Sequence, residues 1–377
     1  MLNRRTLRIK IMQSLFAYEQ CKEADYLLAH DHITASFQPD LNSMKVQDKP
    51  LLKGQLATAV KLFEKKFKDQ AAKEVADPVI GKVVDEALAL HKKITKKDFD
   101  FLRKNIVTDV EKISVYYHSV LNLITAFADV AAQDKKIVSR NFSSNPSVAA
   151  LRKNTELKKE TLRTGGSWDQ KMDLVKGWFR DCIKPDKEFQ KFLALGSAGK
   201  DEHKAFIKHF IRKLILGPTI INSYFEEEDL RWAEDHEIVK SMADKTMKSL
   251  NEETGDLEIQ KLSLDWDEDK VFIERLFVAS SKLEPAYHEL IANNTKNWEV
   301  DRLPLTDRVI LEMAIAELIE FPNIPVKVTI NEYIELAKQY STPKSRQFIN
   351  GILDVIAREL KELGKIKKSG RGLMDNK

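Results

Sequence analysis

The residues best suited to chemistry lie at the start of the chain, where Arg4, Arg5, Arg8 and Lys10 crowd one end of an expected helix. Guanidinium groups present forked donors that suit phosphate oxygens, and their planes can stack on unpaired bases. Direct contact with RNA is therefore one interpretation of the cluster. A second interpretation stays open, because basic N-termini are common and positive charge at a helix N-terminus opposes the helix dipole, so this end could simply fray.

Other residues of chemical type do not form a recognisable site. The segment 196–200 has the glycines and lysine of a phosphate loop, but it lacks their spacing and no strand precedes it, so we expect a turn between helices. His203 and His209 are six residues apart, do not share a helical face, and are expected to be solvated. Two cysteines, Cys21 and Cys182, fit a reducing compartment. We therefore predict no metal, no cofactor and no enzymatic activity.

The composition indicates an all-α protein. The chain has 377 residues, of which 43% are apolar and 32% are charged, with only 13 glycines and 11 prolines. Leu, Lys, Glu and Ala dominate, as helices prefer. The net charge of +4 does not by itself predict a polyanionic partner. There is no run of about eighteen apolar residues and no signal peptide pattern, so we expect a soluble, cytoplasmic protein that does not associate with a membrane.

Apolar periodicity places helices along the whole chain. The first part is expected to be helical at 4–21, 54–73, 78–93, 97–132, 167–183, 201–216 and 232–250, with a loop at 31–50 and a connector with one short helix at 133–167. An acidic break at 251–256 is the best boundary. Beyond it the sequence predicts helices at 267–293 and 304–320, one that Thr329 and Glu332 open as a capping box, and one that Thr342 and Pro343 open and that ends before Gly364.

An ordered set of residues in the last hundred positions resembles the NusB family. The set comprises Trp298, Arg302, Leu303, Asp307, Arg308, Ile310, Leu311, Glu317, Leu318, Pro325, Ile330, Asn331, Glu332, Glu335, Leu336, Ala337, Lys338, Ser345, Phe348, Asn350, Gly351, Leu353 and Asp354. The first helix, with Arg4, Arg5, Arg8 and the run 13–16, looks like the arginine-rich first helix of the family. The resemblance covers about 272–363 and this helix. Most of the segment between 22 and 265 has no counterpart, and the enlarged form looks like NusB-like proteins of the Bacteroidetes lineage.

The resemblance implies two NusB-like helical bundles and a role in transcription antitermination. It implies binding to the boxA element of nascent ribosomal RNA, a small-subunit ribosomal protein, NusE, as partner, and action on the RNA polymerase elongation complex. The implied RNA-binding residues are Arg4, Arg5, Arg8, Lys10, Gln13, Lys344, Ser345, Arg346 and Phe348. The implied protein-partner residues are Asp307, Arg308 and Glu317.

Several of these residues have a second, structural interpretation. Phe348 fits a core position as well as a base-stacking platform, and Asp307 fits a charge that interacts with a helix dipole. Asn350 is expected to be a buried amide that ties two helices together, beside a close helix approach at Gly351. Two other functions stay open. The chain could be a helical scaffold without specific RNA binding, or an RNA-delivery module related to the NusB bundles that are fused to rRNA methyltransferases.

The predicted domain organisation has four parts. Residues 1–22 are the basic N-terminal helix, 23–256 are a helical insertion that enlarges the N-terminal bundle, 257–364 are the NusB-like C-terminal bundle, and 365–377 are a basic, disordered tail. The insertion is expected to fold, because its apolar residues are periodic.

Overall fold

The structure is a computed structural model that describes residues 2–42, 44, 46–69, 77–137, 139–251, 253–294 and 303–376. Within these residues the chain forms helices and no β-strand, so the all-α prediction is confirmed. No helix among them combines the length and the apolar character that crossing a bilayer requires. Trp298 and Arg302 of the C-terminal motif, Glu252 of the acidic break and Lys377 of the tail lie outside the described residues.

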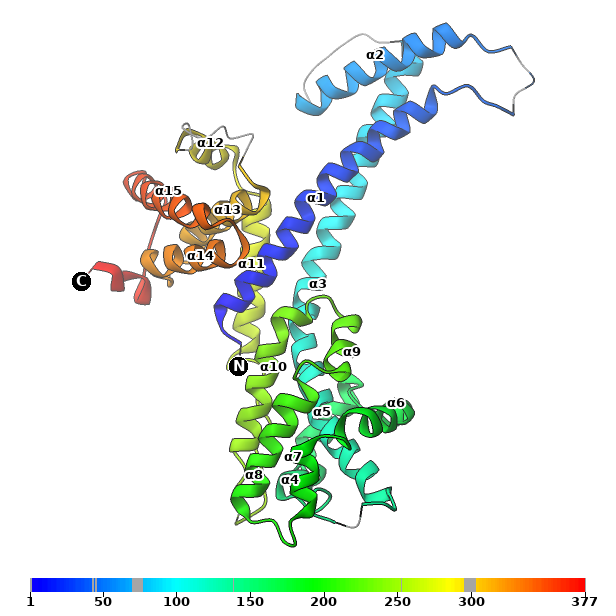
Figure 1. Ribbon diagram of the computed structural model, residues 1–377. Coiled ribbons are helices and arrows are strands. Elements are labelled where there is room, and N and C mark those ends of the chain that lie inside the picture. Colours follow the sequence, from blue (N-terminus) through cyan, green and yellow to red (C-terminus); the bar gives the residue numbers. More distant parts are fainter. Residues whose placement is uncertain are drawn as a thin grey trace. The chain divides into compact units, whose positions relative to one another are not determined.

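The chain divides into two compact units. Unit 1 contains Met1–Leu7 and Thr108–Asp269, and unit 2 contains Arg8–Val107 and Lys270–Lys377. Three helices have residues in both units: α1 (Arg4–Ser36), α3 (Pro78–Gln133) and α11 (Trp266–Ser281) (Figure 1). This division differs from the predicted boundaries after residues 22, 256 and 364, because the chain passes between units inside helices, where composition gives no break.

Two helices are longer than their sequence patterns predicted. Helix α1 continues to Ser36 instead of ending near residue 21, and α3 joins the two helices expected at 78–93 and 97–132. Neither 22–36 nor 94–96 contains glycine or proline, so no residue there ends a helix. Local polarity in these segments marks an exposed face of a continuous helix.

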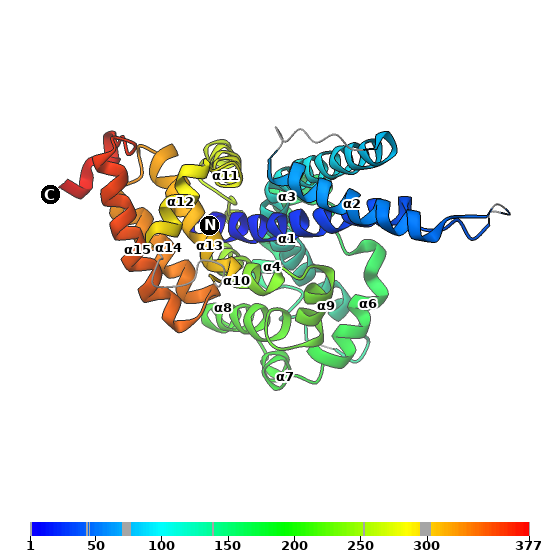
Figure 2. The ribbon, with the colours of Figure 1, turned by 90° about the horizontal axis from the view of Figure 1, so that it is seen from above.

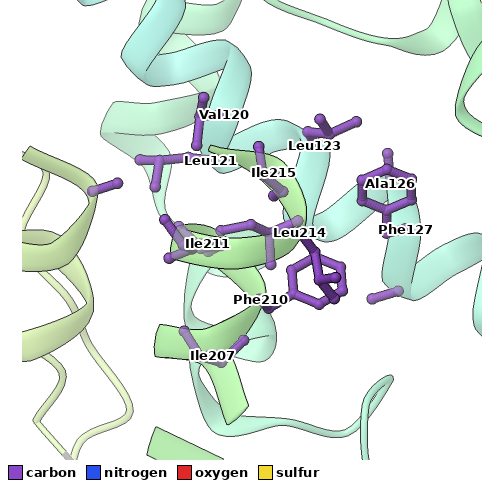
Figure 3. Packing of buried hydrophobic residues seen from close by; sticks show 14 of the residues in the cluster. Val120, Leu121, Leu123, Ala126, Phe127, Ile207, Phe210, Ile211, Leu214 and Ile215 are labelled. Carbon is purple, nitrogen blue, oxygen red and sulfur yellow. The ribbon is translucent and has the colours of Figure 1, made fainter. Parts of the chain in front are cut away.

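Unit 1 is built around the second half of α3. Its other helices are α4 (Pro146–Lys153), α5 (Thr155–Thr164), α6 (Met172–Trp178), α7 (Lys187–Ala194), α8 (Lys200–His209), α9 (Ile220–Glu228) and α10 (Trp232–Lys248), with π-helical turns at Phe179–Ile183 and Phe210–Ile215. Figure 3 shows Val120, Leu121 and Phe127 of α3 in one apolar cluster with residues of α8 and the second π-helical turn. The connector expected to hold one short helix contains two, α4 and α5.

A buried histidine in this unit predicts a pH-dependent stability. His118 is 4% exposed, and burial lowers its pKa to about 4, against a weaker opposing effect of Glu160. Between pH 6.5 and pH 4 the unfolded chain therefore binds a proton that the folded chain does not. The contribution of His118 to the free energy of unfolding is complete above pH 6.5 and is lost as the pH falls. The loss is about 2 kcal/mol between pH 7 and pH 5.

Urea unfolding of the wild type and His118→Gln at both pH values checks this prediction. The variant removes the titrating group, so its loss of stability on acidification should be smaller by that amount. An equal loss in both proteins would contradict the assignment to His118.

In unit 2, the N-terminal part of the chain forms an arm of three helices. Helix α2 (Lys49–Lys68) packs against α1 and the start of α3, as Figures 1 and 2 show. The apolar contacts come from Ala29 and Ile33 of α1, Leu62 and Phe63 of α2, and Val84 of α3. The helix starts earlier than the predicted residue 54, because Asp48 caps it by accepting the Leu51 N–H at 3.0 Å. The insertion therefore folds, as predicted from its periodicity.

The C-terminal part of unit 2 contains the end of α11 with α12 (Pro285–Asn294), α13 (Leu305–Glu320), α14 (Val326–Tyr340) and α15 (Pro343–Glu362). The helix expected at 267–293 is broken, since Pro285 starts α12 as a first-turn proline. Thr342 caps α15, as predicted, by accepting the Ser345 N–H. The prediction of a capping box at Thr329 is wrong, because α14 already begins after Pro325 and Thr329 is buried within it.

Three further predictions about the C-terminal residues are wrong. A Cβ atom on Gly351 would meet no heavy atom within 4 Å, so no close helix approach requires this glycine, and Asn350 is exposed. The tail forms a 3-10 turn at Gly370–Asn376 instead of being disordered, and the Ser369 N–H donates to the Pro322 carbonyl at 3.0 Å. A Cβ on Gly372 would lie 2.0 Å from that carbonyl oxygen, so the tail contacts this loop because glycine leaves room there.

Candidate nucleic-acid interface

The start of α1 in unit 1 carries Arg4 and Arg5. Asn3 caps the helix, with its side-chain oxygen accepting the Thr6 N–H at 2.9 Å. Arg5 is exposed, whereas Arg4 is half-buried and pairs with Glu268. Positive charge in a first helical turn opposes the helix dipole, so helix stability does not account for these side chains. Both lie where an anionic ligand could contact them.

Arg8, by contrast, is a core residue of unit 2. It is 2% exposed, and its Nε and Nη2 donate to the two carboxylate oxygens of Glu317 at 2.7 and 2.8 Å. Burial opposes its positive charge, but the adjacent Glu317 outweighs this effect and raises the pKa of Arg8 above its usual value. Glu332 lies 3.5 Å away as a second carboxylate. The prediction that Arg8 contacts RNA is corrected, because its guanidinium is enclosed and already neutralised.

Glu317 is the centre of this buried cluster. Besides Arg8, its carboxylate accepts hydrogen bonds from the Thr329 hydroxyl at 2.9 Å and the Tyr333 hydroxyl at 3.0 Å. It therefore joins α1, α13 and α14, and it is fully buried. Its predicted place on a protein-partner surface is corrected for the same reason: its carboxylate is fully engaged inside the unit.

The other predicted residues of α1 face inward as well. Lys10 is 2% exposed, and Gln13 is half-buried. An ammonium group as enclosed as that of Lys10 cannot meet a phosphate in this conformation. Of the five basic and polar residues predicted on α1, only Arg4 and Arg5 remain as accessible cationic contacts.

A second basic surface lies at the start of α15 in unit 2. Lys344 and Arg346 are exposed, Phe348 is half-buried, and Ser345 between them is buried. The Ser345 hydroxyl donates to Asp307 at 2.7 Å, and the Ser341 hydroxyl donates to the same carboxylate. Ser345 therefore belongs to the packing between α13 and α15, which corrects its predicted role in RNA contact.

The predicted partner surface on α13 is reduced to one residue. Asp307 lies in the first turn of α13, as the dipole interpretation predicted, but it is 2% exposed and is held by the two serine hydroxyls, so it is not available as a partner contact. Arg308 is exposed and pairs with Glu19 at 3.0 Å. Of Asp307, Arg308 and Glu317, only Arg308 is available to another protein.

The motif-like residues of unit 1 have structural roles. The segment 196–200 leads into α8, where the Gly199 N–H donates to Glu202 at 2.7 Å as a helix cap, as expected of a turn. His203 and His209 are half-buried, not solvated: Asn145 contacts His203 at 3.0 Å, and Asp186 contacts His209 at 3.1 Å. Among the residues that the structure describes, no three His, Cys, Asp or Glu side chains are arranged to hold a metal ion.

Sequence reasoning missed a basic cavity in unit 2. It has a volume of about 1120 Å³ and is lined by residues of α1, α2 and α3 and by Lys282, which follows α11; the cations in the lining are Lys66, Lys92, Lys96, Arg103 and Lys282. The lysine pairs at 92–93 and 96–97, followed by Phe99, Phe101 and Arg103, are the pattern that could have indicated it.

Comparison with known proteins relates the chain to one family. The NusB family model matches residues 232–358. A transcription antitermination protein NusB from Salinibacter ruber is 40% identical over 140 residues, which cover 35% of this chain and 88% of that protein. NusB of Chloroherpeton thalassium is 49% identical over 85 residues, or 22% of this chain and 40% of the relative.

A third relative and the solved structures complete the comparison. NusB of Dictyoglomus turgidum is 40% identical over 99 residues, or 26% of this chain and 69% of the relative. No solved structure matches the chain. The Salinibacter protein matches along most of its own length and only about a third of this chain, so this chain is an enlarged form. It belongs to the NusB family of non-enzymatic transcription antitermination factors.

Proposed function

We propose that this chain acts in transcription antitermination in the cytoplasm, by binding a boxA-type element of nascent ribosomal RNA together with the ribosomal protein NusE. Family membership and the exposed cations at two helix starts support the proposal. Arg5 on α1, and Lys344 and Arg346 on α15, all lie in or next to a first helical turn. Cations there oppose the helix dipole, and RNA phosphates would turn that unfavourable placement into a favourable contact.

The two helix starts have separate roles in this proposal. Arg4 and Arg5 in unit 1 contact phosphates, and Arg4 exchanges Glu268 for RNA. In unit 2, Lys344 and Arg346 contact phosphates, while the half-buried ring of Phe348 is offered to an unpaired base. The exposed side chain of Arg308 on α13 contacts NusE in this proposal, and the complex acts on the RNA polymerase elongation complex.

Replacing the cations at either helix start is expected to weaken RNA binding. The double variants Arg4→Ala/Arg5→Ala and Lys344→Ala/Arg346→Ala each remove two cations that neutralise RNA phosphates. The slope of log affinity against log salt should therefore fall by about 0.7 for each phosphate that is no longer neutralised. Fluorescence anisotropy with boxA-type RNA and a scrambled RNA, with and without NusE, measures both affinity and slope.

A matched control is Lys158→Ala/Lys159→Ala, which removes two exposed lysines from α5. It should leave affinity for boxA-type RNA unchanged. Equal, salt-sensitive binding of the wild type to both RNAs, or the absence of any NusE effect, would contradict the proposal and favour a NusB fold used as a protein scaffold.

A further inference from the structure

The cavity lined by α1, α2, α3 and Lys282, named the α3 groove, is dominated by cations. Its lining contains five Lys and Arg residues against two carboxylates, Asp85 and Asp100. Lys66 pairs with Asp85 at 2.7 Å. Among the described residues, Lys92, Lys96 and Arg103 form no ion pair, and all three are exposed. The α3 groove therefore presents positive charge that the chain itself does not neutralise.

This charge is concentrated in the enlarged part of the chain. Residues 49–104 contain fourteen Lys and Arg against eight Asp and Glu, whereas the remaining residues have a slight acidic excess. Nearly all of the lining lies outside residues 232–358, which the family model matches. The α3 groove is thus a feature of this enlarged form that has no counterpart in the matched segment.

Aromatic side chains lie among the cations. Phe67 is 39% exposed and meets the His91 ring edge-on, with centroids 5.0 Å apart. Tyr18 and Phe99 are nearly buried below, and the Lys282 ammonium lies 5.1 Å from the Phe99 ring centre. Burial lowers the pKa of His91, so this ring is an uncharged aromatic surface at neutral pH. Flat rings beside cations suit unpaired bases, which stack in a sequence-tolerant way.

The spacing of the cations indicates the size of the ligand. Lys92, Lys96 and Arg103 follow one another along α3 over eleven residues, which is about 16 Å of helix at 1.5 Å per residue. One compact anion could meet only part of this row, and the volume exceeds the roughly 300–1,000 Å³ of ordinary small-molecule pockets. A chain of phosphates can meet all three cations, and its bases can reach Phe67. An acidic peptide would satisfy the charges but not the exposed ring.

We infer that the α3 groove binds a single-stranded segment of RNA, with Lys92, Lys96 and Arg103 on phosphates and Phe67 against a base. The inference rests on the proposed function, because it takes RNA to be the ligand, and it adds a second contact region to the two helix starts. This region would bind RNA that flanks the boxA-type element, without strong sequence preference.

The test compares a short RNA that holds only the boxA-type element with the same RNA extended by about 12 unpaired nucleotides, a length typical of single-strand sites. The wild type should bind the extended RNA about tenfold more tightly. In Lys92→Ala/Lys96→Ala/Arg103→Ala this gain should disappear, and the salt slope for the extended RNA should fall by about 2, at about 0.7 for each phosphate that is no longer neutralised. Affinity for the short RNA should not change.

The chain offers a closely matched control. Lys93, Lys97 and Lys104 have the same spacing on α3, are equally exposed and lie outside the lining of the α3 groove. Their triple alanine variant removes the same charge from the same helix and should keep the gain. A gain intact in the groove variant, or equally reduced in the control, would overturn the inference. Thermal unfolding of both variants verifies that α3 remains folded.

Two readouts separate the remaining outcomes. Photocrosslinks from 4-thiouridine in the extension should map to peptides containing Phe67 and Lys92, and crosslinks confined to other peptides would count against the groove. If a poly-glutamate peptide binds the wild type but not the groove variant, and the RNA extension has no effect, an acidic protein segment is the occupant and the RNA inference fails. Failure of the proposed function is recognised separately, as loss of discrimination between boxA-type and scrambled short RNA.

Discussion

Replacing Arg8 by alanine is expected to destabilise unit 2 by about 3–5 kcal/mol, because the change leaves Glu317 charged and buried without its main partner. The two hydroxyl donors of Thr329 and Tyr333 remain, but hydroxyl hydrogen bonds do not neutralise a carboxylate. Hydrogen exchange measured by mass spectrometry should show faster exchange in α13 and α14. Segments of unit 1 around residues 120–127 should keep their protection.

Arg5→Ala provides the comparison for this result. Arg5 is exposed, so its replacement should change stability by no more than about 0.5 kcal/mol. Arg5 should therefore affect RNA binding at constant stability, whereas Arg8 should affect binding only through folding. An Arg8→Ala protein with unchanged exchange and weakened RNA binding would show that Arg8 faces the ligand, against its buried arrangement in unit 2.

Replacing Trp232 by alanine is expected to destabilise unit 1 by about 3–5 kcal/mol, the usual range for removing a large buried aromatic ring. Trp232 is 1% exposed and stacks on Phe225 with centroids 4.8 Å apart. Its indole N–H donates to the side-chain oxygen of Asn222 at 2.9 Å, and this oxygen would lose that donor. Urea unfolding followed by circular dichroism measures the destabilisation, and hydrogen exchange should locate it in α9 and α10.

Leu230→Ala is the neighbouring control, because Leu230 is 93% exposed and its removal creates no cavity. It should change stability by less than about 0.5 kcal/mol. A comparable destabilisation in the two variants would mean that the packing around Trp232 differs from the arrangement in unit 1. Spread of the Trp232→Ala effect to α13 and α14 would instead show that the two units unfold together.

The sequence by itself determined the fold class, several helix ends and the order of the cationic residues along the chain. Apolar periodicity with few glycines and prolines is enough to predict an all-α chain, since both properties act over a few neighbouring residues. The helix start predicted from Thr342 and Pro343 also depends only on neighbouring residues, and α15 begins there. The helix ends predicted near position 21 of α1 and near position 95 of α3 were wrong. The residues there are polar, and an exposed helical face resembles a loop in composition.

Only the tertiary structure decided which charged residues face solvent. Arg8 and Glu317 are 309 positions apart, so no local pattern links them. Without a visible partner, an arginine in a basic cluster is predicted to be exposed. The hydrogen bond between Asp307 and Ser345 also joins residues 38 positions apart, which no local pattern links. The α3 groove likewise depends on which faces of α1, α2 and α3 pack together. Burial of a charge is favourable only when a distant partner neutralises it, and packing alone brings such partners together.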